Sequence, residues 1–146
     1  MDNEGRMHYG DLQAGDEFVS QGRTVTEADV VNFSGLSGDF NPLHVDAEYG
    51  RNKTIFGKNI AHGLLGAAIM SGLGSVSPSL AEAGYVNIDW RFSAPIFFGD
   101  TVVLYNKVAE KLPLEGNAGK VVFERKLKNQ KGEVVQEGKI TILVKL

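Results

Sequence analysis

Asp39 and His44 are the two side chains of this sequence best placed for proton transfer. They bound the segment Asp39–His44 (DFNPLH), in which Asn41 precedes a proline. A residue before proline is disfavoured in the α region, so this segment cannot simply continue the helical pattern before it. A carboxylate and an imidazole that a turn holds beside apolar neighbours could share one water molecule, as acid–base catalysis requires. The structural alternative is an Asx turn followed by a hydrogen-bonded core histidine.

A second group of candidates begins the most apolar stretch of the chain, Ile60 to Val76. Gly63 falls in the expected first turn of a helix, where unpaired backbone N–H groups and the helix dipole can hold a negatively charged oxygen. Because glycine has no Cβ, a carbonyl group could approach it closely. Ser71 adds a hydroxyl about two turns further along the same helix. With the Asp39/His44 pair, these groups suit chemistry on an activated carbonyl.

Composition narrows the class of protein. The 146 residues, 42% of them hydrophobic, predict one globular domain spanning residues 1–146. A net charge of −3 without dense basic clusters argues against nucleic acid as a partner. With no cysteine there is no thiol nucleophile, thiolate metal site or disulfide. The apolar stretch is too short and too glycine-rich for a membrane span, and the polar N-terminus is not a signal peptide, so we expect a cytoplasmic protein.

Two helices are expected to flank the Asp39–His44 segment. The first begins after Thr26, and Thr26 and Asp29 can form a capping box. Val25 and Val30 can form a hydrophobic staple at the same end, and the helix ends near Gly35 or Gly38. A single helical turn is possible at residues 46–49. The second helix covers about 61–76, and because it is apolar on every side we expect it to be buried.

Strand patterns dominate the second half of the chain. Val86–Phe92 alternates apolar and polar residues, as a half-buried strand does, with Trp90 and Phe92 in the core. The other expected strands are residues 16–20, 101–108 and 120–127 and a last one ending near Val144, with a loop at 112–119 and a hairpin turn at 129–132. Helices followed by antiparallel strands predict an α+β domain with one sheet packed on a central helix.

Three stretches together resemble the MaoC-like (R)-specific enoyl-CoA hydratases. They are DFNPLHVD at 39–46, AHGL at 61–64 and PIFFGDT at 95–101, and the resemblance extends over nearly the whole chain. It implies a single hotdog fold, in which a curved antiparallel β-sheet wraps around a long central α-helix. It also implies assembly into a homodimer or higher homo-oligomer, because relatives with two repeats are longer than this chain.

The resemblance also implies the function of particular residues. Asp39 and His44 would be the acid/base pair that holds the catalytic water, and the N–H of Gly63 would bind the thioester oxygen. Ser71 would support the pocket, and Asn41 would orient the catalytic loop. The substrate would be a trans-2-enoyl thioester of coenzyme A or acyl carrier protein, hydrated reversibly to the (R)-3-hydroxyacyl thioester without a metal or a redox cofactor.

Two other functions remain open. A hotdog thioesterase usually relies on a carboxylate in the central helix, and no Asp or Glu lies between Ala61 and Leu80. A non-catalytic module could bind acyl thioesters and use the Asp39/His44 pair only for structure.

Several further residues have structural interpretations. We expect His62 to fix the loop before the central helix and Asp100 to be a turn residue. Arg51, Lys53 and Lys58 could meet the phosphates of coenzyme A, although a solvated basic surface is the simpler interpretation. The glycine-containing stretch at 116–120 is expected to be a hairpin loop, because its spacing does not fit a phosphate-binding loop.

Overall fold

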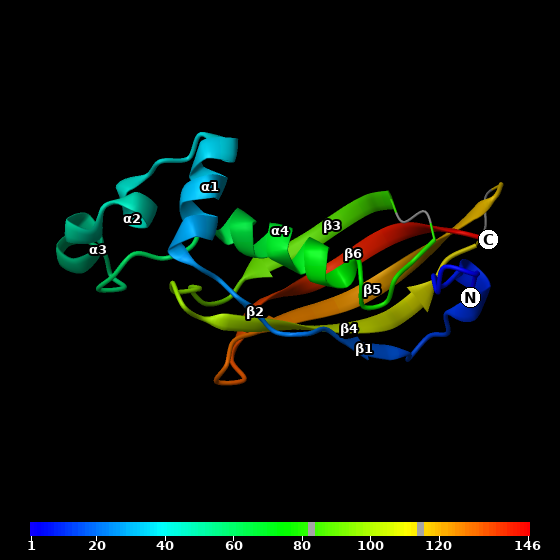
Figure 1. The fold of residues 1–146 in the computed structure, drawn as a ribbon. Coiled ribbons are helices and arrows are strands. Elements are labelled where there is room, and N and C mark those ends of the chain that lie inside the picture. Colours follow the sequence, from blue (N-terminus) through cyan, green and yellow to red (C-terminus); the bar gives the residue numbers. More distant parts are fainter. Residues whose placement is uncertain (82–83, 114–115) are drawn as a thin grey trace.

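One antiparallel sheet and one central helix form the body of the molecule in this computed structural model, which describes residues 1–81, 84–113 and 116–146. The sheet contains, in spatial order, β1 (Glu17–Val19), β4 (Thr101–Lys111), β5 (Ala118–Lys128), β6 (Val134–Lys145) and β3 (Gly84–Phe92), and β2 (Arg23–Thr24) also pairs with β4. It curves around α4 (Gly63–Gly74), which lies across one face (Figure 1). The expected α+β architecture is confirmed.

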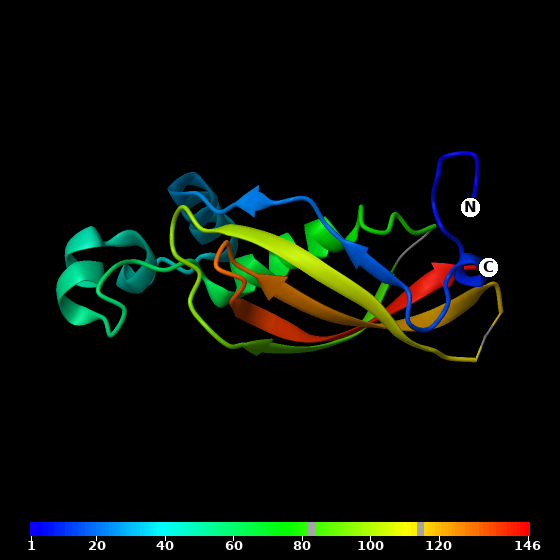
Figure 2. The ribbon, with the colours of Figure 1, turned by 90° about the horizontal axis from the view of Figure 1, so that it is seen from below.

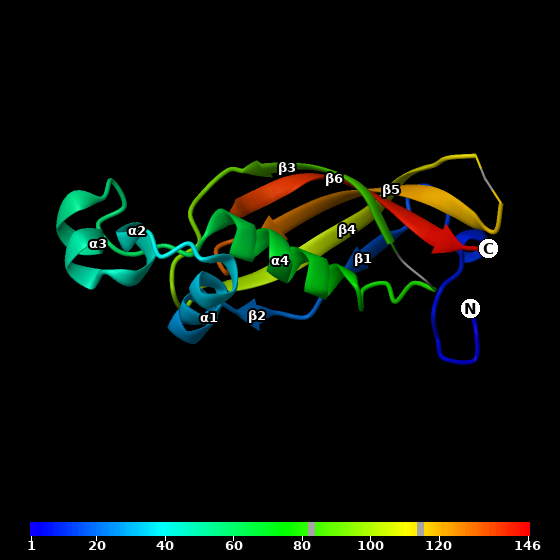
Figure 3. The same ribbon diagram turned by 90° about the horizontal axis from the view of Figure 1, so that it is seen from above.

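The core lies between α4 and the middle strands. Buried and exposed residues alternate along β4 and β5, so that one face of each strand meets the helix. Seen from above, α4 runs over the concave side of the sheet (Figure 3). Fully buried members of this core include Met70, Leu104, Phe123 and Ile140.

Strand β3 differs from its prediction. It forms the edge of the sheet beside β6, and nearly all of its residues are exposed. Trp90 is partly buried against the core, but Phe92 is 53% exposed, so the prediction that Phe92 lies in the core was wrong. Alternation of apolar and polar residues indicates a strand but does not show which strands lie beside it. Strand β3 is an edge strand that pairs with β6, so most of its side chains stay exposed.

Helix α1 (Glu27–Ser37) begins and ends as the sequence predicts. The Thr26 hydroxyl accepts a hydrogen bond from Asp29 N (3.1 Å), and the Asp29 carboxylate accepts one from Thr26 N (2.8 Å). Gly38, at φ +80°, ends the helix in the left-handed conformation that glycine adopts without strain. The Arg23 guanidinium, 2.8 Å from the same carboxylate, holds the pKa of Asp29 well below its usual range.

Two short helices project from the end of the sheet as an arm. They are α2 (Pro42–Val45) and α3 (Ala47–Lys53), and both lie beyond the strands at the end far from the two termini (Figure 2). The sequence predicted at most one turn at 46–49, whereas α3 runs for seven residues and α2 was not expected. The Asn59 amide holds the arm to the body by donating to Leu43 O and Asp46 O, each at 2.9 Å.

The remaining boundaries lie close to their predictions. Helix α4 is two residues shorter at each end than expected, and the predicted hairpin at 129–132 joins β5 to β6 through a bond from Gly132 N to Asn129 O (3.0 Å). Of the expected loop at 112–119, residues 114–115 lie outside the described part of the chain, and β5 already begins at Ala118. Among the described helices, none has the length and apolar character needed to cross a membrane.

A buried cation lies beside the last turn of α4. Arg125 on β5 is 1% exposed and donates to Asn106 Oδ1 (3.1 Å) and to the Tyr85 hydroxyl (2.9 Å). Burial lowers the pKa of the Arg125 guanidinium from its usual value. Gly74 faces this group so closely that an added Cβ would lie 2.5 Å from Nη1. The helix can therefore pack here only because position 74 has no side chain.

Candidate active site

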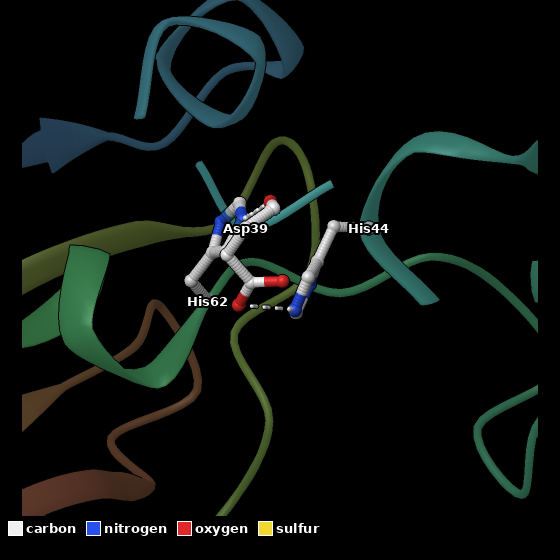
Figure 4. Close-up of side chains that lie close together, drawn as sticks. All are labelled: Asp39, His44 and His62. Carbon is white, nitrogen blue, oxygen red and sulfur yellow. Dashed lines mark hydrogen bonds and ion pairs between the residues drawn. The ribbon is translucent and has the colours of Figure 1, made fainter. Parts of the chain in front are cut away.

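Asp39 and His44 face each other across a short gap. Asp39 Oδ2 lies 3.9 Å from His44 Nε2, which is too far for a direct hydrogen bond (Figure 4). The gap does allow one water molecule to make a hydrogen bond of about 2.8 Å to each group. The histidine ring is buried and the carboxylate is half exposed.

The turn between the two residues is held by Asn41. Its Oδ1 accepts from Leu43 N (2.9 Å) and so caps α2, while its own N–H donates to Asp39 Oδ1 (3.1 Å). Asn41 therefore fixes both the start of the helix that carries His44 and one oxygen of the Asp39 carboxylate. This arrangement supports the predicted orienting function of Asn41.

The proton on neutral His44 is placed by the loop before α4. His44 Nδ1 lies 2.8 Å from Ile60 O, a carbonyl that can only accept. Nδ1 must therefore carry the proton, which leaves the lone pair of Nε2 directed at the gap beside Asp39. The buried imidazole presents an acceptor to any water held there.

His62, the residue before α4, contacts both members of this pair. Its ring stacks on the His44 ring with centroids 3.8 Å apart and planes 24° apart, and its Nε2 lies 3.0 Å from Asp39 O. The sequence predicted only that His62 fixes the loop before the helix. The contact with His44 joins residues 18 positions apart, and the single sign of it in the sequence was the Ala61-His62-Gly63 motif.

Gly63 is the first residue of α4. The sequence predicted that it lies in the first turn of this helix. Within the described residues its N–H has no hydrogen-bond acceptor, as is usual for the first turn of a helix. Its own carbonyl accepts from Gln136 Nε2 (3.0 Å), which fixes the peptide against β6. The Phe92 ring lies so close that an added Cβ would be 2.9 Å from Phe92 Cδ1.

Two cavities meet at Gly63 and Phe92. The first contains the pair and His62 and is completed by Phe33, Ser37 and Leu64. The second lies between the loop before α4 and the segment after β3, with the apolar walls Phe56, Ile60, Pro95 and Ile96. Gly63, whose N–H is free, therefore lines both cavities.

Ser71 lies apart from this group. It lines a third cavity with Tyr85, Arg125 and Ile142, about 12 Å along α4 from Gly63 at the usual helical rise. The structure therefore does not bring Ser71 to the Asp39/His44 pair within one chain, because the two turns that separate them are fully helical.

Asp39, His44 and His62 also form a group whose ligand atoms lie within 4.8 Å of one another. A metal ion must lie near the ring plane of each histidine that binds it, because the nitrogen lone pair lies in that plane. Rings stacked at 3.8 Å with planes only 24° apart cannot both direct a lone pair at one ion. This geometry does not fit a shared metal.

Other predicted residues have structural partners. The Asp100 carboxylate accepts from Phe97 N and from Gln130 Nε2, both at 2.9 Å, so it closes the turn before β4 as predicted. Arg51 pairs with Glu48 on the arm, and Lys58 covers the Phe97 ring at 4.1 Å.

A curved antiparallel sheet wrapped around one helix, with the site at that helix's N-terminus, defines a hotdog-fold protein. A Mycobacterium tuberculosis protein described as having a double hotdog fold shares this fold, with a TM-score of 0.81 at 15% identity over 99% of this chain and 46% of that one. The chain belongs to the MaoC-like dehydratase family, because residues 11–131 match the model of the MaoC like domain.

Two relatives are similar over almost their whole length. An (R)-specific enoyl-CoA hydratase from Rhodospirillum rubrum is 38% identical over 140 residues, which cover 94% of this chain and 92% of that protein. The unliganded R-hydratase PhaJ1 from Pseudomonas aeruginosa superposes with a TM-score of 0.83 at 30% identity, covering 96% of this chain and 86% of that one.

Proposed function

We propose that this protein hydrates trans-2-enoyl thioesters reversibly to (R)-3-hydroxyacyl thioesters. The observation that carries the proposal is the gap between Asp39 Oδ2 and His44 Nε2, 3.9 Å wide, beside the free N–H of Gly63. It offers two proton acceptors for one water and one donor for a developing oxyanion. The names of the relatives support both the reaction and the (R) product.

Each step of this reaction has a group in the site. The water donates hydrogen bonds to Asp39 and His44, its oxygen bonds to the β-carbon, and the pair takes up the proton that it loses. The pair returns a proton to the α-carbon of the resulting enolate, so that water is added overall. Which of the two groups carries that proton is a property of the coupled pair.

The charge that develops on the thioester oxygen is met by Gly63. Its N–H points from the N-terminus of α4, where the helix dipole also favours negative charge. Removal of one such donor in other enzymes costs about 3–4 kcal/mol of transition-state stabilisation. The proposed reaction needs neither a metal nor a redox cofactor, and the acyl group would arrive on coenzyme A or on acyl carrier protein.

The proposed enzyme forms a homodimer or a higher homo-oligomer and acts in the cytoplasm. The exposed apolar edge of the sheet at β3 supports self-association. The thioesterase alternative loses support because α4 carries no carboxylate at any of its 12 positions. The binding-module alternative predicts the same fold without turnover, so only an assay separates it from the hydratase.

The test is the loss of enoyl-thioester absorbance when the purified protein meets crotonyl-CoA. We expect rapid loss, a 3-hydroxybutyryl product and no free thiol, with turnover lowered by orders of magnitude in Asp39→Asn and His44→Ala. Asp39→Asn should still bind substrate. Absence of turnover with crotonyl-CoA, with longer enoyl-CoA thioesters and with a carrier-protein thioester would reject the hydratase in favour of a binding module.

A further inference from the structure

His62 Nδ1 is the one buried side-chain nitrogen or oxygen of the described residues that has no hydrogen-bond partner. The His62 side chain is otherwise well held and only 3% exposed. Because buried polar atoms are nearly always paired, an unpaired one calls for an explanation. An inert core position could be filled by an apolar ring of the same shape without this cost.

Hydrogen bonding at the other nitrogen fixes the tautomer of His62. Nε2 lies 3.0 Å from Asp39 O and 3.1 Å from the Ser34 hydroxyl. The Asp39 carbonyl can only accept, so Nε2 carries the proton and Nδ1 keeps its lone pair. A proton on Nδ1 would be a buried donor without an acceptor. The structure therefore assigns to His62 the single role of donor, through Nε2.

The His62 ring is also fixed in orientation. One face stacks on His44 at 3.8 Å, and Phe33 contacts the ring edge-on with centroids 4.9 Å apart. The Ser34 contact ties the same ring to α1. His62 is thus held between the helix that precedes the Asp39 loop and the helix that carries His44.

Both members of the proposed pair depend on this ring. Asp39 lies in an exposed loop just after Gly38, and two local hydrogen bonds hold it: the Ser37 hydroxyl accepts from Asp39 N, and Asp39 Oδ1 accepts from the main-chain N–H of Asn41. The hydrogen bond from His62 joins the Asp39 main chain to the residue that precedes α4. On the other side, stacking sets the plane of the His44 ring, and that plane contains the Nε2 lone pair.

We propose that His62 is a positioning residue for the hydration reaction. Its Nε2–H holds the Asp39 main chain, and its face holds the His44 ring. Together these contacts keep the carboxylate and the imidazole at a separation that one water molecule can bridge. This inference rests on the proposed hydratase function. Because it concerns alignment in the reacting complex, loss of His62 should lower kcat with little change in KM.

Two substitutions separate the two contacts. His62→Phe keeps a planar ring against His44 but cannot donate to Asp39 O, whereas His62→Gln can donate through its amide but cannot stack. We expect each to lower kcat for crotonyl-CoA by about tenfold or more while KM changes by about twofold or less. His8→Gln is the matched control, since His8 bonds Leu146 O and Asp2 at the far end of the molecule; its kcat should equal that of the wild type.

A spectroscopic measurement on the wild type tests the tautomer without any turnover. In a long-range ¹H–¹⁵N spectrum of uniformly labelled protein at neutral pH, we expect His62 Nε2 protonated and Nδ1 bare, with the signals assigned by their loss in His62→Phe. A protonated Nδ1 overturns the proposal, and so does an unchanged kcat in both folded variants. If the wild type shows the tautomer but hydrates no enoyl thioester, the proposed function fails while the assignment of the His62 tautomer stands.

Discussion

The two groups of the proposed pair differ in their contact with solvent. The Asp39 side chain is 52% exposed, whereas that of His44 is 9% exposed and bonded to Ile60 O. Water can therefore reach the gap past the carboxylate, while the imidazole keeps a fixed proton on Nδ1. The carboxylate side is consequently the side from which the nucleophilic water of the proposed reaction enters.

Gly63→Ala tests the free space at the start of α4. Its Cβ would lie 2.9 and 3.0 Å from the Phe92 ring, so the ring must move and the room for a thioester oxygen shrinks. We expect kcat/KM for crotonyl-CoA to fall by about tenfold or more, equivalent to about 1.4 kcal/mol of transition-state stabilisation. Gly72→Ala, on the same helix with nothing within 4 Å, should retain full activity. Equal activity of the two variants would remove Gly63 from the site.

For the site residues, the sequence predicted those features that depend on neighbours along the chain. Asn41 before a proline indicated the turn that brings Asp39 toward His44, and Gly63 indicated the start of α4. It did not show that His62 stacks on His44 or that Phe92 covers Gly63. These contacts join distant segments, and their geometry depends on how the loop before α4 packs against β3.

Among the elements, α1 offers a test of pH dependence. The hydrogen bond from Arg23, helped by the N–H of Thr26, lowers the pKa of Asp29 below its usual 3.8. A carboxylate with a lowered folded-state pKa stabilises the protein above its unfolded pKa, and this stability is lost as the pH falls through the folded value. We expect Asp29→Asn to lower the free energy of unfolding at pH 7 and to flatten its decline below about pH 4.

Urea unfolding at pH 7, 4 and 3 measures this difference between Asp29→Asn and the wild type. Asp16→Asn serves as the control, because Asp16 accepts a loop hydrogen bond from Gln13 N without an ion pair. An identical pH dependence in Asp29→Asn and the wild type would show that folding does not lower the pKa of Asp29.

Two of the four glycines in helix α4 are expected to respond oppositely to substitution by alanine. Gly72→Ala should raise Tm by about 3 °C, since alanine favours the helix by about 1 kcal/mol and the position is open. Gly74→Ala would place its Cβ 2.5 Å from the buried Arg125 guanidinium, and overpacking of this kind costs about 1–3 kcal/mol. Differential scanning calorimetry compares the two, and a higher Tm for Gly74→Ala would contradict the packing described here.

The elements themselves were largely predictable, for identifiable reasons. Thr26 and Asp29 encode the start of α1, and the apolar character of 61–76 on every side encodes the burial of α4. The arm was underestimated, because α2 and α3 bury little and owe their position to bonds with Asn59. The exposure of β3 was missed because a strand pattern does not reveal its place in the sheet.

For the whole molecule, the open edge at β3 predicts assembly. Tyr85, Val86 and Ile88 are each 49% exposed, and an apolar edge strand with unpaired backbone groups favours pairing with another copy. We expect Ile88→Lys to produce monomers in light scattering coupled to gel filtration. Val19→Lys, on the exposed β1 strand at the opposite edge, should retain the oligomer. A monomeric wild type would contradict this prediction.

The positions of Met1 and Leu146 have a practical consequence. Both lie at one end of the sheet, where His8 bonds the Leu146 carbonyl, while the α2–α3 arm, whose α2 carries His44, lies at the other (Figure 1). A fusion partner or surface linker attached at either terminus would therefore emerge far from the α2–α3 arm. The molecule can be immobilised by its ends with the arm directed into solution.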